Sequence, residues 1–352
     1  MKTEMLYLKS LCLSICFFTT LFSINAQDDL PPTIKYEEVQ TLFQQLGTYD
    51  KMVIKTDLDS VMINKKFTDD QPATILFYGP ELPVLKFKTK IKARGKYRRV
   101  KCDIPPLKLN FSKSELADLG LYRNFDKLKL VTHCSEEGRM DDVVLKEHWV
   151  YKMYNSVSDY SFNVKLFSVV YVDSKDRSRK WEGQGFILEP NEELAFRYDG
   201  QIVDTLATKI EDLTPKIYHH FLMFNYMIGN TDWHIATQKN MKFLRLKGEK
   251  KLMIIPYDFD NCRMVDAPYM TLYPDAKKRK LDNRHAKRKY SSKVELHEEI
   301  NWFKTLNNES GIHCYVQCEK LSRNEKLKIK GYLKPFFKSL KKKKRLEREF
   351  LD

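Results

Sequence analysis

Glycine and proline are both scarce in this chain of 352 residues, which contains 12 of the first and 13 of the second. That composition argues against an array of small modules, because the linkers between modules are built largely from these residues. No internal repeat and no long low-complexity segment is present either. Hydrophobic residues make up 42% of the chain and aromatic residues 12%, so the sequence predicts a fold with a substantial core.

Acidic residues are in deficit, since 47 Asp and Glu stand against 62 Lys and Arg for a formal net charge of +15. Much of the excess lies in the last quarter, where residues 277–289 hold eight basic residues and one Asp and residues 341–345 are all basic. Such charge suits an anionic polymer or membrane phosphate, although a solvated surface with a frayed tail has the same composition. Aromatic residues are not interleaved with it, so a nucleic-acid-binding protein is the weakest interpretation.

Long apolar runs are missing apart from one near the start, between Leu11 and Phe22. Lys2 and Lys9 precede this run and a small residue, Ala26, follows it, which is typical of a secretory signal peptide. The run is too short to favour a membrane-spanning helix. The sequence therefore predicts a signal peptide at 1–26, no transmembrane segment after its removal, and a protein exported to the periplasm, the cell surface or the medium.

Cysteine is sparse, and two of the seven, Cys12 and Cys16, lie in the predicted leader. Among the five that remain, Cys102 and Cys134 both lie beside strand-like runs. In an oxidising compartment they are the pair that we expect to form a disulfide.

The most informative stretch of the chain begins with a helix. Thr214 and Pro215 are residues that commonly open one, and Gly229 commonly closes one. Apolar residues recur between them at spacings of four, three and four, at Ile217, Phe221, Phe224 and Ile228. The spacing predicts a helix with one buried face, followed by a polar loop that contains Asp232.

Two β-like runs follow, at 241–246 and 251–256, separated by a short segment that contains a glycine. This is the pattern of an antiparallel hairpin. If the last residue of the first run pairs with the first residue of the second, Asn240 lies opposite Tyr257 and beside Asp258. Asp232, Asn240 and Asp258 are then predicted to gather at the open end of the hairpin.

These three side chains are the groups that phosphoryl transfer requires. An Asp near the acceptor can orient or deprotonate a hydroxyl, and an Asn and a second Asp can hold Mg²⁺ or Mn²⁺. Asp258 and Asp260 could instead cap a turn after the hairpin, since Asp is common there. The three groups together at this spacing favour the kinase-like interpretation.

The stretch resembles the atypical kinases of the spore coat protein H (CotH) family. The residues that carry the resemblance are Asn230-x-Asp232-x-His234, the pair Lys239-Asn240 before a strand, and Pro256-Tyr257-Asp258-Phe259-Asp260. The interval between the Asp and the Asn is longer here than is usual in that family. The resemblance implies ATP as the donor, Asp232 as the catalytic residue, and Asn240 and Asp258 as metal ligands with Asp260 in reserve.

The first half of the chain is rich in predicted strands, at 73–78, 85–91, 107–111, 128–131, 164–172 and 185–189, with helices at 36–46 and 141–154. Arg94-Gly95 before a strand with a central Lys108 also resembles the CotH pattern, which implies that both contact nucleotide phosphates. No GxGxxG loop is present to cover them. Glu147 is the expected acidic partner of Lys108, although an exposed Glu fits the same helical spacing. The strand that ends at Glu189, followed by Pro190 and Asn191, resembles the linker between the lobes of kinases, which implies that Glu189 lies near the adenine.

The resemblance and the order of elements predict an α+β, two-lobed protein-kinase-like fold. A β-rich lobe would occupy 27–188, and a mainly helical lobe with the catalytic hairpin and a basic tail would occupy 189–352. The predicted function is an exported kinase that transfers phosphate from ATP to a protein, glycan or other hydroxyl acceptor. Because ATP is scarce outside the cytoplasm, the alternative is an inactive scaffold of the same fold that binds an anionic partner in the envelope.

Overall fold

A computed structural model describes residues 34–63, 65, 69–135, 139–204, 208–270 and 284–351. Lys35–Asp352 forms one compact unit. The predicted signal peptide at 1–26 and part of the basic run at 277–289 lie outside the described residues. Within the described ranges, every helix is too short or too polar to span a bilayer.

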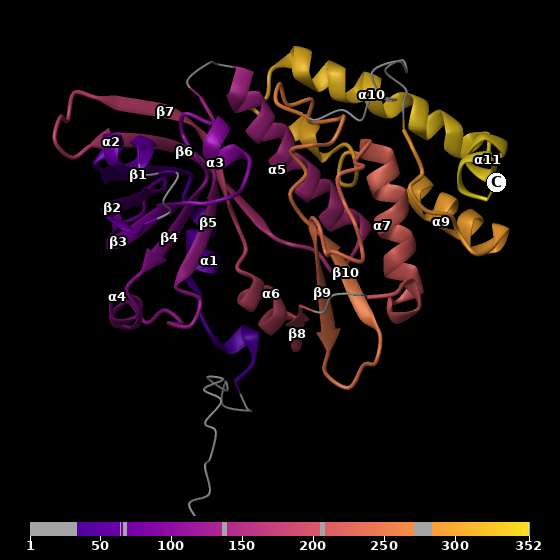
Figure 1. The fold of residues 1–352 in the computed structure, drawn as a ribbon, viewed down its shortest axis with the longest axis horizontal. Coiled ribbons are helices and arrows are strands. Elements are labelled where there is room, and N and C mark those ends of the chain that lie inside the picture. Colours follow the sequence, from indigo (N-terminus) through magenta and orange to yellow (C-terminus); the bar gives the residue numbers. More distant parts are fainter. Residues whose placement is uncertain are drawn as a thin grey trace, which may run out of the picture. The chain divides into compact units, whose positions relative to one another are not determined.

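The first half of the unit is a closed barrel of seven strands in the order β1-β2-β3-β4-β5-β7-β6 (Figure 1). β1 pairs with β6 in parallel and all other neighbours are antiparallel. The strands are β1 (Lys51–Thr56), β2 (Gln71–Tyr78), β3 (Leu85–Ala93), β4 (Leu107–Phe111), β5 (Lys127–Val131), β6 (Val164–Asp173) and β7 (Lys180–Leu188). Short helices lie between or before them: η1 (Tyr36–Glu38), α1 (Leu42–Gln45), η2 (Leu46–Thr48), α2 (Leu58–Ile63), α3 (Arg98–Lys101) and α4 (Lys113–Asp118).

Period-two alternation of residues builds the barrel. In β3, for example, Phe87 and Ile91 are fully buried inside, whereas Lys86, Lys88 and Lys90 are exposed outside. Four phenylalanines from different strands meet in the interior, with ring centroids 5.1 to 6.4 Å apart: Phe77, Phe87, Phe111 and Phe167. The interior of the barrel is therefore a packed core with no room for a ligand among these rings.

The long helix α5 (Arg139–Val157) belongs to a second hydrophobic core, which also includes the elements after the barrel. A three-stranded antiparallel sheet in the order β10-β9-β8 and several helices complete it (Figure 1). The elements are α6 (Asn191–Arg197), β8 (Gly200–Val203), η4 (Ile210–Asp212), α7 (Pro215–Ile228), β9 (Met241–Leu246), β10 (Leu252–Pro256), α9 (Lys293–Thr305), η5 (Cys314–Gln317), α10 (Arg323–Lys341) and α11 (Lys344–Phe350).

Helix α7 begins and ends where the sequence predicts. Pro215 is its first residue, and Gly229 ends it with φ +67°. A Cβ at Gly229 would lie 2.2 Å from the hydroxyl of Tyr332, so only glycine fits this left-handed position. The polar loop that carries Asp232 therefore leaves the helix in a fixed direction.

The predicted fold class is wrong. The structure has a closed mixed barrel with helices around it instead of a two-lobed protein-kinase-like fold with a helical second lobe. Our interpretation assigned no strand to 51–56, yet β1 closes the barrel by pairing with β2 and β6. The helix predicted at 36–46 is also broken into three short turns. Closure joins segments more than 100 residues apart, which local periodicity does not reveal.

The disulfide between Cys102 and Cys134 is confirmed, with their Cα atoms 4.5 Å apart. Cys102 directly follows α3, and Cys134 lies just beyond β5. The bond therefore ties the basic segment 94–101 to the barrel.

Removal of this disulfide should destabilise the protein by about 2 to 4 kcal/mol, because the bond closes a loop of 32 residues in the unfolded chain. Denaturant unfolding of the double variant Cys102→Ala/Cys134→Ala measures the loss. Reductant should lower the stability of the wild type and leave that of the double variant unchanged. Equal wild-type stability with and without reductant would contradict the prediction.

Candidate functional site

A cleft of about 890 Å³ lies between the barrel end near α3 and the segments that flank the β9–β10 hairpin. Asp232, Asn240, Asp258 and Asp260 all line it, and Arg94, Gly95 and Arg98 line it from the barrel side. The hairpin has the predicted register, because Met241 pairs with Pro256 and the N–H of Tyr257 donates to the carbonyl of Asn240 at 3.1 Å. The side chains of Asp232, Asn240 and Asp258, from the loop before the hairpin and the loop after it, thus meet at one place.

Asp232 is positioned by buried amides at the end of α7. Its N–H donates to the Oδ1 of Asn230 at 3.0 Å, and the Nδ2 of Asn230 donates to the Oδ1 of Asn225 at 2.8 Å. The ammonium of Lys287, from the basic run, donates to the carbonyls of Thr231 and Trp233 on either side. The loop is therefore held from both sides, which places the Asp232 carboxylate at the cleft wall.

The side-chain amide of Asn240 has only one workable orientation. Its Nδ2 lies 2.7 Å from the carbonyl oxygen of Asp232 and 3.1 Å from the Oδ2 of the same residue. Both neighbours are acceptors, so the amide must present its NH₂ to them. The Oδ1 of Asn240 receives no hydrogen bond from a described residue and remains able to bind a cation.

Backbone strain is concentrated at the same place. Gln238, Asn240 and Asp258 line the cleft with φ of +49°, +59° and +63°. Left-handed backbone costs a non-glycine residue about 1 to 2 kcal/mol, and such residues gather at functional sites. The Asp258 N–H donates to the hydroxyl of Tyr151 on α5 at 2.8 Å, which helps to hold this conformation. Its carboxylate forms no hydrogen bond or ion pair with any described residue.

Asp260 lies deeper, beside a buried arginine. Arg98 Nη1 lies 3.4 Å from Glu147 Oε2 and 3.9 Å from Asp260 Oδ2, and its Nη2 donates to the carbonyl of Thr132 at 2.8 Å. Burial raises the pKa of Asp260, the charge of Asp258 raises it further, and Arg98 lowers it. Burial likewise raises the pKa of Glu147 against the effect of Arg98. The single positive charge of Arg98 therefore does not fully compensate the negative charges of Glu147, Asp258 and Asp260.

The residues predicted to contact nucleotide are only partly in the cleft. Arg94 lines it, and Lys108 lies on the outer face of β4, two residues beyond the cleft-lining Pro106. Glu147 contacts Arg98 instead of Lys108. Glu189 is fully buried, where it forms an ion pair with Arg197 at 2.7 Å and accepts the N–H of Asn163, so its carboxylate serves the fold.

Three residues of the site are not among the functional residues predicted from the sequence. Lys239 forms an ion pair with Asp232, Asn261 donates to the Oδ2 of Asp232 at 3.4 Å, and Arg98 bridges two carboxylates. The position of Asn261 directly after Asp260 indicates from the sequence alone that its side chain lies near the site. Nothing in the sequence distinguishes Arg98 from the basic residues around it.

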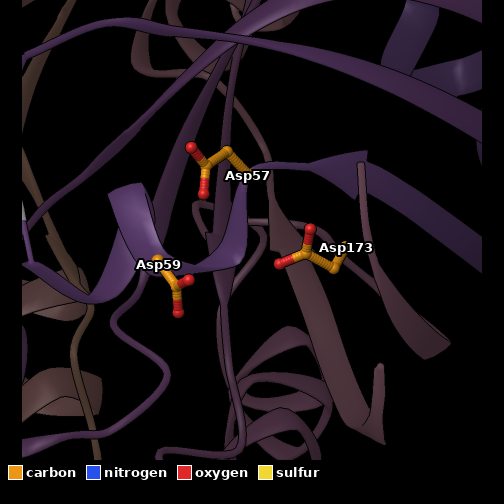
Figure 2. A group of neighbouring side chains, drawn as sticks. All are labelled: Asp57, Asp59 and Asp173. Carbon is orange, nitrogen blue, oxygen red and sulfur yellow. The ribbon is translucent and has the colours of Figure 1, made fainter. Parts of the chain in front are cut away.

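A second acidic group lies on the barrel, away from the cleft residues. Carboxylate oxygens of Asp57, Asp59 and Asp173 come within 4.8 Å of one another, at the start of α2 and the end of β6 (Figure 2). The chain's own cations occupy this group, because Lys175 contacts Asp57 at 2.7 Å and Arg179 contacts both other residues. Two cations of the chain therefore neutralise most of the charge of the three carboxylates.

No protein-family model and no curated protein sequence matches this chain. Among solved structures, the proinflammatory kinase CtkA of Helicobacter pylori matches 70% of this chain and 91% of its own. The sequence identity is 13% and the TM-score is 0.35. Likeness at that level establishes neither a shared fold nor a shared activity, so the function must be argued from the cleft. The expected membership of the CotH family finds no support in these comparisons.

Proposed function

We propose that the protein transfers a phosphoryl group from ATP to a hydroxyl acceptor, with the reaction in the cleft between α3 and the β9–β10 hairpin. The observation that carries the proposal is the meeting of Asp232, Asn240 and Asp258 in one cleft that basic residues line on the opposite side. Phosphoryl transfer depends on positioning and on charge neutralisation, and this arrangement supplies groups for both.

Asp232 would accept the proton of the hydroxyl acceptor or orient it. Its carboxylate faces the cleft, and the amides of Asn240 and Asn261 fix its Oδ2. An aspartate held in this way can act on a hydroxyl at hydrogen-bond distance once Lys239, which pairs with its Oδ1, moves aside. Arg94 lies on the opposite wall, where its positive charge suits phosphate oxygens.

The donor atoms fit a hard divalent cation. Asp258 and the Oδ1 of Asn240 offer oxygen ligands that no described side chain occupies, and Asp260 is in reserve beside Arg98. Oxygen ligands from one or two carboxylates, together with substrate phosphates, are what Mg²⁺ prefers. When bound, Mg²⁺ or Mn²⁺ would neutralise phosphate charge.

Export remains part of the proposal. A disulfide such as Cys102–Cys134 forms and persists in oxidising compartments, which supports it. The phosphate donor would then have to be supplied outside the cytoplasm.

Asp232→Asn should lower phosphate transfer from ATP by about 100-fold or more and leave ATP affinity within about two-fold. The reason is that a general base contributes about 10² to 10⁴ to the rate and little to ground-state binding. Radiolabel incorporation and nucleotide titration measure the two quantities. Asp212→Asn, at an exposed Asp in η4, is the control and should behave as the wild type.

Loss of ATP binding in Asp232→Asn, or unchanged transfer, would contradict the assignment. A wild-type protein that binds no nucleotide but holds heparin-like polymers would instead be the envelope binding protein that the charge distribution also allows.

A further inference from the structure

Three lysines lie side by side on the outer face of the barrel. In the strand register, Lys108 of β4 is opposite Lys92 of β3 on one side and Lys129 of β5 on the other. Neighbouring strands are about 4.8 Å apart, so the row spans roughly 10 Å. Like charges directly opposite each other destabilise a sheet. Local stability therefore does not explain the row.

The row continues one wall of the cleft. Arg94, Pro106 and Val131 line the cleft two residues from Lys92, Lys108 and Lys129, respectively. The antiparallel pairing continues past the ends of β3 and β4, because the N–H of Arg94 donates to the carbonyl of Pro106 at 2.8 Å, and side chains two residues apart in such an extended pair share a face. Two residues along a strand correspond to roughly 7 Å. The amines of Lys92, Lys108 and Lys129 thus lie just beyond the cleft wall that faces Asp232 and Asp258.

Lys129 is the most enclosed of the three amines. Its Nζ donates to the Oδ1 of Asn191 at 3.2 Å, at the start of α6. Burial is the main cause that lowers the pKa of Lys129 to about 8, and the positive charges of Arg94, Lys242 and Lys108 contribute to the same net value against the charge of Glu192. Those four are the charged groups that face it, from the segment directly after β3, from β9, from β4 and from α6.

Acidic residues compensate this charge only in part. Lys92 lies 3.6 Å from Asp70, and Lys242 lies 3.1 Å from Asp204. Lys108 forms no ion pair with a described residue. With Arg94, five cations thus share the region with three acidic groups, Asp70, Glu192 and Asp204, all of which are exposed. The surplus charge is available to an anion.

We propose that Lys92, Lys108 and Lys129 form a binding site for a chain of linked phosphates, with Lys129 as the residue that selects such a chain over a single phosphate. A row of point charges along three strands matches a linear polyanion, because each amine can meet a different phosphate group. This inference rests on the proposed function in one respect. If the protein uses ATP, the phosphate chain that the lysines bind is that of a nucleoside triphosphate.

The test is calorimetric titration of the intact protein with inorganic tripolyphosphate, without added metal. Lys129→Met should weaken binding by about 10-fold or more, as expected for loss of a partly buried charge-assisted hydrogen bond. Lys127→Met is the matched control, since Lys127 lies on the same face of the same strand but is exposed. Its affinity should stay within about two-fold of the wild type. Equal affinity of Lys129→Met and the wild type, or equal wild-type affinity for orthophosphate and tripolyphosphate, would overturn the inference.

Two further readouts separate this role from a structural one. Lys129→Met should melt at the same temperature as the wild type or higher, because it removes repulsion; a lysine needed for folding would show a lower one. Near pH 8, wild-type binding should take up protons that the variant does not take up, as the anion restores the charge on Lys129. Wild-type binding without proton uptake, or a clearly lower melting temperature of the variant, would count against the inference.

The outcome is distinguishable from failure of the proposed function. Metal-free tripolyphosphate binding does not need Asp258, so Asp258→Asn should retain it and lose only effects that require Mg²⁺. Tripolyphosphate binding without any phosphate transfer would uphold the anion site and reject the kinase. If the wild type transfers phosphate but Lys129→Met binds tripolyphosphate as tightly as the wild type does, the kinase is upheld and the anion site is rejected.

Discussion

Asp258→Asn should lower phosphate transfer from ATP by at least about 100-fold, which corresponds to about 2.7 kcal/mol. Asp258 is the cleft carboxylate without a partner among the described residues, and it holds a strained φ of +63°. Asparagine tolerates that backbone and has nearly the same shape, so the substitution removes the charge alone. Radiolabel transfer at saturating Mg²⁺ measures the effect, and a higher Mn²⁺ concentration should recover part of the rate.

Asp266→Asn is the matched control for this substitution. Asp266 also has a positive φ, +53°, but it is exposed and does not line the cleft. It should transfer phosphate at the wild-type rate. If both variants lose activity equally, the effect belongs to the loop backbone and Asp258 is not a metal ligand.

Arg98→Met should destabilise the protein by about 3 to 5 kcal/mol at neutral pH. Arg98 is buried between Glu147 and Asp260, and its removal leaves two buried carboxylates uncompensated. Denaturant unfolding measures the loss. Arg99→Met, one residue along α3, should cost less than about 0.5 kcal/mol. The double variant Arg98→Met/Glu147→Gln should regain much of the lost stability because it removes one of the stranded charges.

The loss in Arg98→Met should depend on pH in a definite direction. In the native protein, burial already raises the pKa of Glu147 and of Asp260, and Arg98 opposes the increase. Without Arg98 both pKa values rise further, so the folded state binds protons that the unfolded state has released. The stability that this protonation gives is complete below the unfolded pKa values and is lost as pH rises through the folded ones. The destabilisation should therefore be smallest in mildly acidic solution, where both carboxyls of the folded protein are protonated, and should grow as pH rises through their folded pKa values. A loss that does not change with pH would show that the carboxylates are already compensated by other groups.

The parts of the fold that the sequence predicted are those set by local rules. Pro215 and Gly229 bound α7, and a short turn fixes the hairpin register, which in turn places Asn240 opposite Tyr257. Because Asp232 lies shortly after α7 and Asn240 and Asp258 flank the hairpin, their meeting could be predicted without knowledge of the whole fold.

The parts that sequence analysis missed depend on long-range pairing. β1 has the same mixture of lysine and apolar residues as many exposed segments, and only its pairing with β6 reveals that it closes the barrel. Helical spacing correctly predicts that Glu147 lies on the same face of α5 as the buried Val144 and Tyr151. It could not show that the short helix α3, held by the Cys102–Cys134 disulfide, presents Arg98 to that face in place of Lys108. The buried ion pair of Glu189 with Arg197 was invisible for the same reason.

The most direct test of the site is the thermal stability of the wild-type protein with ATP and Mg²⁺ added separately and together. If Asp258 and Asn240 hold a metal that joins the nucleotide to the cleft, both additives together should stabilise the protein by about 2.7 kcal/mol at a ligand concentration 100 times the dissociation constant. Mg²⁺ alone should have no such effect. The same melting temperature with and without the pair, at millimolar concentrations of both, would contradict the assignment of this cleft to phosphoryl transfer.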